Sequence, residues 1–176
     1  MFNKILVAVN NTEIGQQVFE EALTLTSSNN AKLLLLHVIS PFDDDYLAAS
    51  RMQTDEAYTN FHTHGVEYYM RQWEALKQKG IEFLTLLTNR AIAKDINAEF
   101  TQEVGDPSRL ICEMARTWKA DLIIMGRRGR SGLSEFFLGS VSNYVLHNAP
   151  CSVLTVQGAI PTTKNTLMTA STVSSV

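Results

Sequence analysis

The stretch Leu122–Val156, LIIMGRRGRSGLSEFFLGSVSNYVLHNAPCSVLTV, predicts most of the architecture. It begins with an apolar run of strand length that ends at Gly126, and it closes with a second such run, Ser152–Val156. Between them lie a loop rich in glycine and arginine and a segment with helical spacing that starts after Gly139. Because glycine lets backbone N–H groups approach a ligand and a helix N-terminus adds free donors, this order of elements is suited to holding phosphate.

Three more strand-like runs precede this stretch, and helical segments separate them. Ile5–Val9 and Lys32–Val38 are almost continuously apolar, as central parallel strands are, while Ala98–Val104 alternates. Thr12 is a candidate N-cap for the helix between the first two runs, and Asp106, followed by proline, starts a helix after the third. The inferred strands cover about residues 4–9, 32–38, 98–104, 121–126 and 151–156. Strands that alternate with helices predict an α/β fold with a parallel, doubly wound sheet.

The segments between the strands leave some alternatives open. Ser27–Asn30 is expected to break the first helix. Residues 39–50 are interpreted as a loop whose acidic run, Asp43–Asp45, is solvated, since three adjacent aspartates point in different directions and make a poor metal site. From about residue 51 to residue 95 the pattern is mostly helical and fits one kinked helix or two. A short strand that opens after Gly80 is the second alternative.

Composition excludes several classes of protein. The net charge of −3 gives no basic footprint for nucleic acid or for an anionic membrane, and no apolar run approaches the ~20 residues that span a bilayer. The two cysteines, Cys112 and Cys151, lie far apart and are interpreted as buried thiols in a reducing cytosol. We therefore expect a cytoplasmic protein with one domain over residues 1–157, which includes the loop and long helical segment of 39–95, and a flexible polar tail over 158–176.

The glycine spacing of the opening stretch is more specific than a general phosphate loop. Gly126, Gly129, Gly139 and Ser140 form the pattern G-x2-G-x9-G-[ST], which resembles the nucleotide-binding signature of the universal stress protein family, in its ATP-binding branch. The resemblance implies a five-stranded, Rossmann-like sheet of order 3-2-1-4-5 with helices on both faces. It also implies ATP as the ligand, or ADP or AMP, with Mg²⁺ only alongside the nucleotide. A regulatory role in stress response and a homodimer through the last strand, Ser152–Val156, are further implications.

A set of nucleotide-binding residues follows from the same resemblance. The ends of the first and second strands would line the adenine pocket, and the glycine loop and the helix start would contact phosphates and ribose. The matching positions are Ala8, Val9, Asn10, Val38, Met125, Gly126, Arg127, Gly129, Gly139, Ser140, Val141 and Ser142. We expect the hydroxyl and N–H groups of the two serines to donate to phosphate oxygens, and we expect valine at either Gly126 or Gly139 to abolish nucleotide binding while the fold largely survives. The alternative is a plain strand–helix connection whose glycines serve turn geometry only.

Asn10 departs from the family pattern, in which many ATP-binding members carry aspartate. Asparagine still hydrogen-bonds, but it ligates Mg²⁺ less well and cannot act as a general base. No catalytic residue and no metal site is therefore assigned, and any ATPase is expected to be slow. The alternatives are a slow ATP-hydrolysing or nucleotidyl-transfer enzyme, which Asp43–Asp45 folded over the phosphates would favour, and a nucleotide-free interaction protein. His37 is interpreted as a satisfied core residue rather than a ligand.

Overall fold

The computed structural model describes residues 1–40, 61–127 and 139–157 of the chain. All five predicted strands are present there, and each begins and ends within one residue of its expected bounds. They are β1 (Lys4–Ala8), β2 (Lys32–Ile39), β3 (Ala98–Val104), β4 (Leu122–Arg127) and β5 (Ser152–Gln157). The acidic run Asp43–Asp45 and the expected tail, 158–176, lie outside the described residues.

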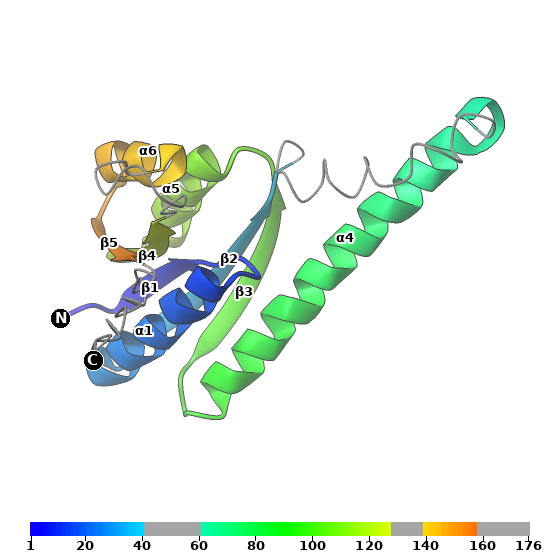
Figure 1. The fold of residues 1–176 in the computed structure, drawn as a ribbon. Coiled ribbons are helices and arrows are strands. Elements are labelled where there is room, and N and C mark those ends of the chain that lie inside the picture. Colours follow the sequence, from blue (N-terminus) through cyan, green and yellow to red (C-terminus); the bar gives the residue numbers. More distant parts are fainter. Residues whose placement is uncertain (41–60, 128–138, 158–176) are drawn as a thin grey trace, which may run out of the picture.

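The strands form a parallel sheet in the order β3-β2-β1-β4-β5, which is visible in Figure 1. The prediction of a Rossmann-like, doubly wound α/β fold is therefore confirmed. Strand β1 lies at the centre, and its residues Ile5, Leu6 and Val7 are fully buried. In register, Ala8 lies beside Leu36 of β2 on one side and beside Met125 of β4 on the other.

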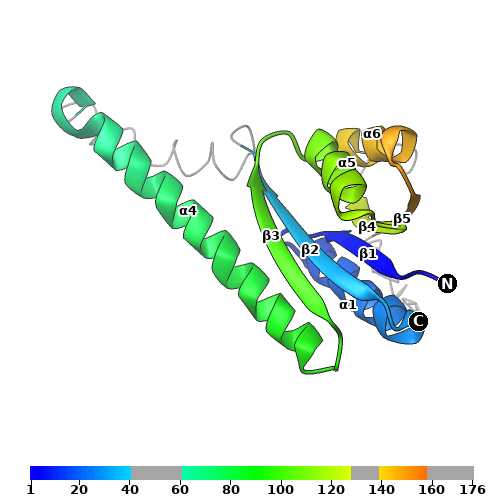
Figure 2. The ribbon, with the colours of Figure 1, turned by 180° about the vertical axis from the view of Figure 1, so that it is seen from behind.

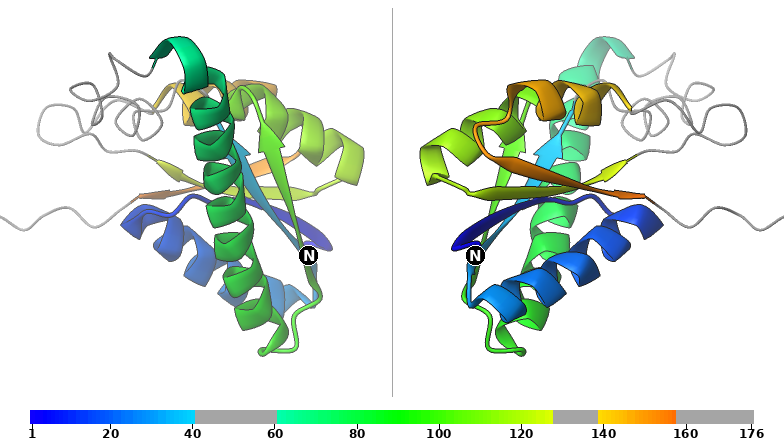
Figure 3. Two further views of the ribbon diagram at one scale, coloured as in Figure 1. Left: turned by 90° about the vertical axis from the view of Figure 1, so that its right-hand side faces the viewer. Right: turned by 90° about the vertical axis from the view of Figure 1, so that its left-hand side faces the viewer.

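Helices cover both faces of the sheet, as Figure 3 shows. The described helices are α1 (Glu13–Asn29), α4 (Phe61–Ile92), α5 (Pro107–Trp118) and α6 (Ser140–Asn148). Successive side chains of β1 pack in the cores on opposite faces of the sheet, because side chains alternate along a strand. Ile5 and Val7 pack in the core with α1 and α4, whereas Leu6 packs in the core with α5 and α6.

Helix α1 ends later than the sequence predicts. Ser27–Asn30 was expected to break it, but the helix continues through Asn29. The reason is that polar side chains in the last turns bond to helix carbonyls instead of drawing the backbone out of the helix. The hydroxyl of Ser28 donates to the carbonyl of Thr24 at 2.7 Å. Asn30 then takes a left-handed conformation, with φ 51 and ψ 41, and ends the helix.

Helix α4 decides between the alternatives for residues 61–92, while residues 51–60 of the predicted helical segment lie outside the described residues. It is one helix over all its 32 residues, so the short strand after Gly80 is wrong. Gly80 lies where α4 crosses β3 closely, since a Cβ atom there would come 1.9 Å from Oε1 of Gln102. The C-terminal half of α4 buries Leu84 and Leu87 against the sheet. Figures 1 and 2 show the N-terminal half extending past the sheet.

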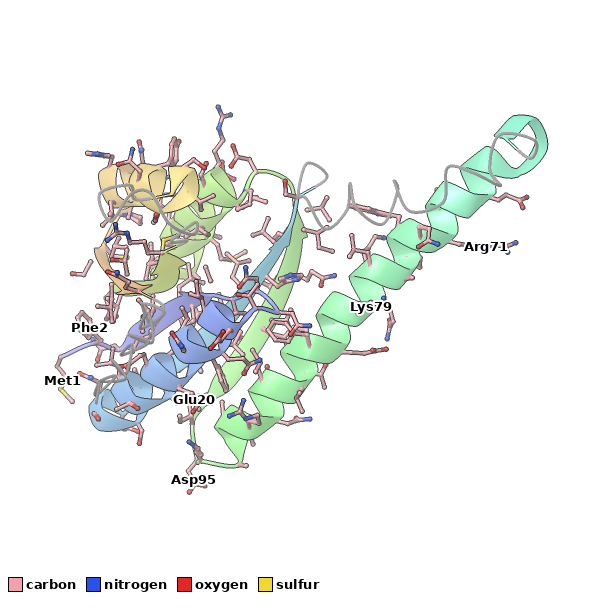
Figure 4. The ribbon with its side chains drawn as sticks, viewed as in Figure 1. Met1, Phe2, Glu20, Arg71, Lys79 and Asp95 are labelled. Atoms are coloured by element: carbon pink, nitrogen blue, oxygen red, sulfur yellow. The ribbon has the colours of Figure 1, made fainter. Side chains whose placement is uncertain are left out.

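Arg90 links the two helices on this face. Its guanidinium group forms an ion pair with Glu20, which Figure 4 labels on α1, and it lies 5.0 Å from the ring centroid of Phe19. Both partners of the ion pair are partly exposed, and exposed pairs contribute little to stability. The buried apolar residues, rather than this pair, therefore hold α4 on the sheet.

Asp121 joins the starts of β1 and β4 at the amino edge of the sheet. One carboxylate oxygen accepts the backbone N–H of Asn3 at 2.7 Å, and the other accepts that of Lys4 at 3.1 Å. Burial alone would raise the pKa of this carboxyl, but the hydrogen bonds from Asn3 and Lys4 outweigh burial and hold the pKa below its ordinary value. Asp121 therefore stabilises the folded state in its ionised form.

We expect Asp121→Asn to lower the free energy of unfolding at pH 7 by about 1–2 kcal/mol, because one acceptor oxygen becomes an amide group that faces backbone donors. Since the folded-state pKa is lowered, the stabilisation is complete above the unfolded-state pKa of about 4 and is lost as the pH falls through the folded-state value. Urea unfolding of both proteins should show their difference shrinking between about pH 5 and pH 3. The carboxyl of Asp106, whose pKa is also lowered, titrates in both proteins and cancels in the comparison. A difference that stays constant across this range would contradict the assigned role.

Candidate functional site

The point where the sheet reverses its strand order lies between β1 and β4. The chain runs outward from β1 to β2 and β3 on one side, and it returns to add β4 and β5 on the other. In parallel α/β sheets a ligand crevice forms at such a point, outside the carboxyl ends of the two strands. Strand β1 ends at Ala8, which is paired in register with Met125, and β4 ends two residues later at Arg127. Val9 and Asn10 directly follow β1, and Gly126 follows Met125 in β4, so the structure brings these predicted site residues together.

Asn10 is held by the first turn of α1. Thr12 is the N-cap of the helix, as the sequence predicts, and its Oγ1 accepts the backbone N–H of Gly15 at 3.1 Å. The same hydroxyl donates to Oδ1 of Asn10 at 2.7 Å, and the backbone N–H of Thr12 donates to the carbonyl of Asn10 at 2.9 Å. The capping residue therefore also fixes the side chain that follows β1.

Gly15 is a site residue that the sequence analysis missed. A Cβ atom at this position would lie 2.0 Å from the backbone oxygen of Asn10 and 2.7 Å from its Oδ1. No side chain fits between them, so glycine is what allows Asn10 to lie directly against α1. The available signal was a glycine in the first turns of a helix, where it lowers helix stability and therefore indicates a packing or functional reason.

Gly126 lies at the crevice and also packs against α1. A Cβ atom here would lie 2.7 Å from Cγ2 of Ile14 and 3.4 Å from Cγ2 of Val18, both on α1. Gly126→Val therefore has to displace Ile14 and is expected to cost stability, while its effect on the nucleotide stays a prediction. A side chain at this position first meets the buried side of α1, because α1 packs directly on this end of β4. A substitution of Gly126 cannot separate ligand binding from stability.

The start of α6 has no side-chain cap. Gly139 is its N-cap residue, and the first helical bond runs from the N–H of Asn143 to the carbonyl of Gly139 at 2.9 Å. The preceding N–H groups, those of Ser140, Val141 and Ser142, have no partner within the helix, as in any first helical turn. Helices α1 and α5 differ, because the side chains of their N-caps accept such N–H groups. In a strand–helix–strand unit of this fold the helix starts at the carboxyl edge of the sheet, so these donors lie at the edge where the crevice forms.

Ser142 lies in the first turn of α6. Its side chain is buried, with 2% of the residue exposed, and its hydroxyl donates to the carbonyl of Gly139 at 3.0 Å. This proton has to leave the carbonyl before it can reach a phosphate oxygen, so the hydroxyl bond to phosphate stays a prediction. The backbone N–H of Ser142, also predicted to bind phosphate, has no partner within the helix. Ser140, the other predicted serine, is exposed at the first position of α6.

The remaining predicted residues are Val38, Arg127 and Gly129. Val38 lies near the end of β2, half-buried on the α5/α6 side, one strand away from Ala8 on the same edge. Arg127 ends β4 and donates to Oε1 of Gln157 at 3.5 Å. Gly129 lies outside the described residues. The structure thus places the candidate residues at the ends of β1, β2 and β4 and at the start of α6, but not those of the loop between β4 and α6.

The histidine and cysteine predictions are largely confirmed. Nδ1 of His37 lies 3.2 Å from Oε1 of Gln102, and its ring meets that of Phe83 edge-on, so its side chain has partners within the fold, although the residue is half-buried rather than in the core. Both cysteines are free thiols, Cys112 buried and Cys151 half-buried, and burial raises the pKa of each. Within the described ranges, no group of three or more histidine, cysteine or acidic side chains could hold a metal ion. No helix described here is long and apolar enough to cross a membrane.

Comparison with known proteins gives a match over most of the chain. The family model described as "Universal stress protein family" matches residues 1–157. Universal stress protein Sll1388 from Synechocystis sp. is 35% identical over 156 residues, which cover 89% of this chain and 98% of that protein.

Solved structures share the fold. A universal stress protein family protein from Arabidopsis thaliana, At3g01520 with AMP bound, has a TM-score of 0.58 at 23% identity, and the match covers 93% of this chain and 97% of that one. A universal stress protein in complex with cAMP has a TM-score of 0.58 at 21% identity over 89% of this chain and 97% of that one. At these identities the similarity shows the fold alone.

Proposed function

Because this chain belongs to the universal stress protein family, we propose that it binds an adenine nucleotide, with ATP the favoured ligand. The observation that carries the proposal is the start of α6, where the N–H groups of Ser140, Val141 and Ser142 have no side-chain cap. They lie at the carboxyl edge of the sheet, where the strand order reverses. The bound AMP and cAMP of the two structural relatives support an adenine nucleotide. In this proposal residues 1–157 act as a cytoplasmic regulatory module in stress response.

Each part of the crevice contacts a different part of the nucleotide. The N–H groups at the start of α6 bind phosphate oxygens, aided by the positive end of the helix dipole. Ala8, Val9 and Val38 line the adenine pocket together with Met125. Asn10 hydrogen-bonds the ribose or the base. Gly129 and the guanidinium of Arg127 face the phosphates. The carboxyl edge of the sheet thereby binds both ends of one nucleotide.

The proposal includes no catalytic residue, and any ATP hydrolysis is slow. An efficient hydrolase needs a group that takes a proton from the attacking water, or metal ions held by carboxylates. The side chain that follows β1 is the amide of Asn10, which cannot accept that proton. A slow ATP-hydrolysing or nucleotidyl-transfer enzyme and a nucleotide-free interaction protein are the competing functions.

The first experiment separates these functions. Freshly purified protein is denatured and any released nucleotide is identified by mass, and the nucleotide-free protein is then titrated with ATP while phosphate release is followed. Bound or bindable ATP with negligible phosphate release is the expected result. Rapid release would identify an enzyme. Failure to bind ATP, ADP or AMP would leave the interaction protein as the function.

We also propose that two copies of the chain pair through β5. This strand is at the edge of the sheet and leaves Leu154 37% exposed and Val153 half-buried, and an apolar edge strand pairs readily with another chain. Leu154→Lys places a charge in the proposed contact and is expected to convert the dimer to a monomer in sedimentation experiments, with unchanged nucleotide affinity. Wild type that sediments as a monomer at high micromolar concentration would contradict the proposal.

A further inference from the structure

Strand β3 is the edge of the sheet opposite β5, and in the described part of the chain it pairs with β2 alone. Figures 1 and 2 show α4 running beside it. We propose that this edge docks an extended segment of another protein, in which apolar and basic residues alternate and which adds to the sheet as a further strand. The proposed nucleotide site lies between β1 and β4, so this inference does not rest on it.

The main-chain groups that β3 turns outward belong to every second residue. The N–H of Leu33 donates to the carbonyl of Asn97 at 2.9 Å, and the N–H of Gly105 donates to the carbonyl of Ile39 at 3.0 Å. Along an edge strand, residues that bond to the neighbouring strand alternate with residues that bond away from it. The odd-numbered residues of β3 therefore bond to β2. The residues whose N–H and carbonyl groups point outward are Ala98, Phe100, Gln102 and Val104.

Apolar side chains from β3 and from α4 flank this open edge. Phe100 is 37% exposed and Val104 is 47% exposed. They lie on the α4 face of the sheet, because Gln102 between them donates to a main-chain carbonyl of α4 at 3.0 Å. Ile81 of α4 is 40% exposed and lies about two and a half turns before Arg90, which pairs with α1, so it is on the side of α4 turned away from α1. An added strand can cover these side chains with apolar residues of its own.

The other face of the same edge is acidic. Glu99 is exposed and Glu103 is half-buried, and both lie on the α5 side, because side chains alternate along the strand. Trp118 of α5 donates its indole N–H to Glu99 at 2.7 Å, and the hydroxyl of Thr101 donates to Glu103 at 3.2 Å. A carboxylate has about four acceptor sites, so both groups can accept further hydrogen bonds. Basic side chains on the second face of an added strand would meet them.

The same charges disfavour a second copy of this chain as the occupant. Two copies would pair antiparallel about a twofold axis, and pairing centred on Gln102 would place Phe100 of one copy opposite Val104 of the other. It would also gather Glu99 and Glu103 of both copies on one face, where like charges repel. The opposite edge, β5, has no charged side chain, so acidity distinguishes the edge at β3.

The first test uses two synthetic peptides of about eight residues, one alternating valine with lysine and the other alternating valine with glutamate. In calorimetric titrations wild type should bind the lysine peptide at least about tenfold more tightly than the glutamate peptide. The double variant Glu99→Lys with Glu103→Lys should reverse this order. Equal affinities of wild type for the two peptides, or no binding of either, would overturn the proposal.

Amide hydrogen exchange followed by NMR tests whether the peptide adds as a strand. In the free protein the N–H groups of Thr101 and Glu103 should be protected, whereas those of Phe100 and Val104 should exchange fast. Saturation with the lysine peptide should slow the second pair by about tenfold or more. Unchanged exchange of that pair in the saturated protein would show that charge alone holds the peptide and would overturn the added strand.

Variants at the two edges locate the docked peptide. Val104→Pro removes one outward N–H, which an edge strand tolerates, and should weaken binding of the lysine peptide by about tenfold or more. Val104→Thr keeps that N–H and should bind within about threefold of wild type. Thermal unfolding checks that the proline variant is folded, and the double glutamate variant tests the same edge without altering the main chain. Leu154→Lys changes β5 and should leave peptide binding unchanged. Loss of binding in Leu154→Lys, or full binding in a folded Val104→Pro, would place the peptide elsewhere and overturn the proposal.

Discussion

Gly139→Asp is expected to abolish nucleotide binding while raising the stability of the protein. Gly139 is the N-cap of α6, and its φ of −53 and ψ of 157 are values that aspartate adopts freely. An aspartate carboxylate there would accept N–H groups of the first turn and complement the helix dipole, which should add roughly 0.5 kcal/mol to the free energy of unfolding. The same carboxylate would occupy the donors proposed for the phosphates and repel their charge.

The loss of affinity should exceed about 100-fold, because several donors and the favourable dipole are lost to the ligand at once and a like charge is added. Calorimetric titration with ATP measures the affinity, and thermal unfolding without nucleotide measures the stability. Gly139→Asn is the matched control, since asparagine also caps the helix but carries no charge. It should bind with intermediate affinity. An aspartate variant that binds ATP like wild type would show that the phosphates do not lie at the start of α6.

Much of the fold could be predicted because its signals are local. Runs such as Ile5–Val9 mark central parallel strands, which are buried on both faces. The caps at Thr12 and Asp106 start helices by hydrogen bonds within the first turn. The single helix α4 could not be predicted in this way, because a glycine such as Gly80 is typical of a break in a helix. Glycine is present at this position because Gln102 of β3 approaches it closely, and helical spacing does not reveal that contact.

The candidate site shows the same division between local and distant contacts. The resemblance of the glycine pattern to the family signature implied Asn10 and Gly139 without any knowledge of their neighbours. The packing role of Gly126 depends on α1, which packs on β4 only in the folded chain, so the sequence does not show that a valine there has to displace Ile14. The bond from the hydroxyl of Ser142 to its own helix likewise depends on the folded chain, in which the residue is buried.

Gly15→Ala is expected to lower the free energy of unfolding by about 2–3 kcal/mol, although alanine is the better helix former by about 1 kcal/mol. The added Cβ would lie 2.0 Å from the backbone oxygen of Asn10, and a backbone atom cannot rotate away as a side chain does. Either the start of α1 or the end of β1 has to shift. Both are anchored by buried residues, among them Val18 and Val9, so the shift disturbs the core.

Gly80→Ala is the matched control, because its Cβ would come equally close to a neighbour, 1.9 Å from Oε1 of Gln102. That oxygen belongs to a side chain that can turn, at the cost of its hydrogen bonds to His37 and to the carbonyl of Lys77. The cost of about 1–2 kcal/mol is offset by about 1 kcal/mol of helix propensity, so urea unfolding should show little change. Gly15→Ala should also weaken ATP binding, since Asn10 must move, whereas Gly80→Ala should bind like wild type. If Gly15→Ala instead stabilised the protein, Asn10 would not lie against α1.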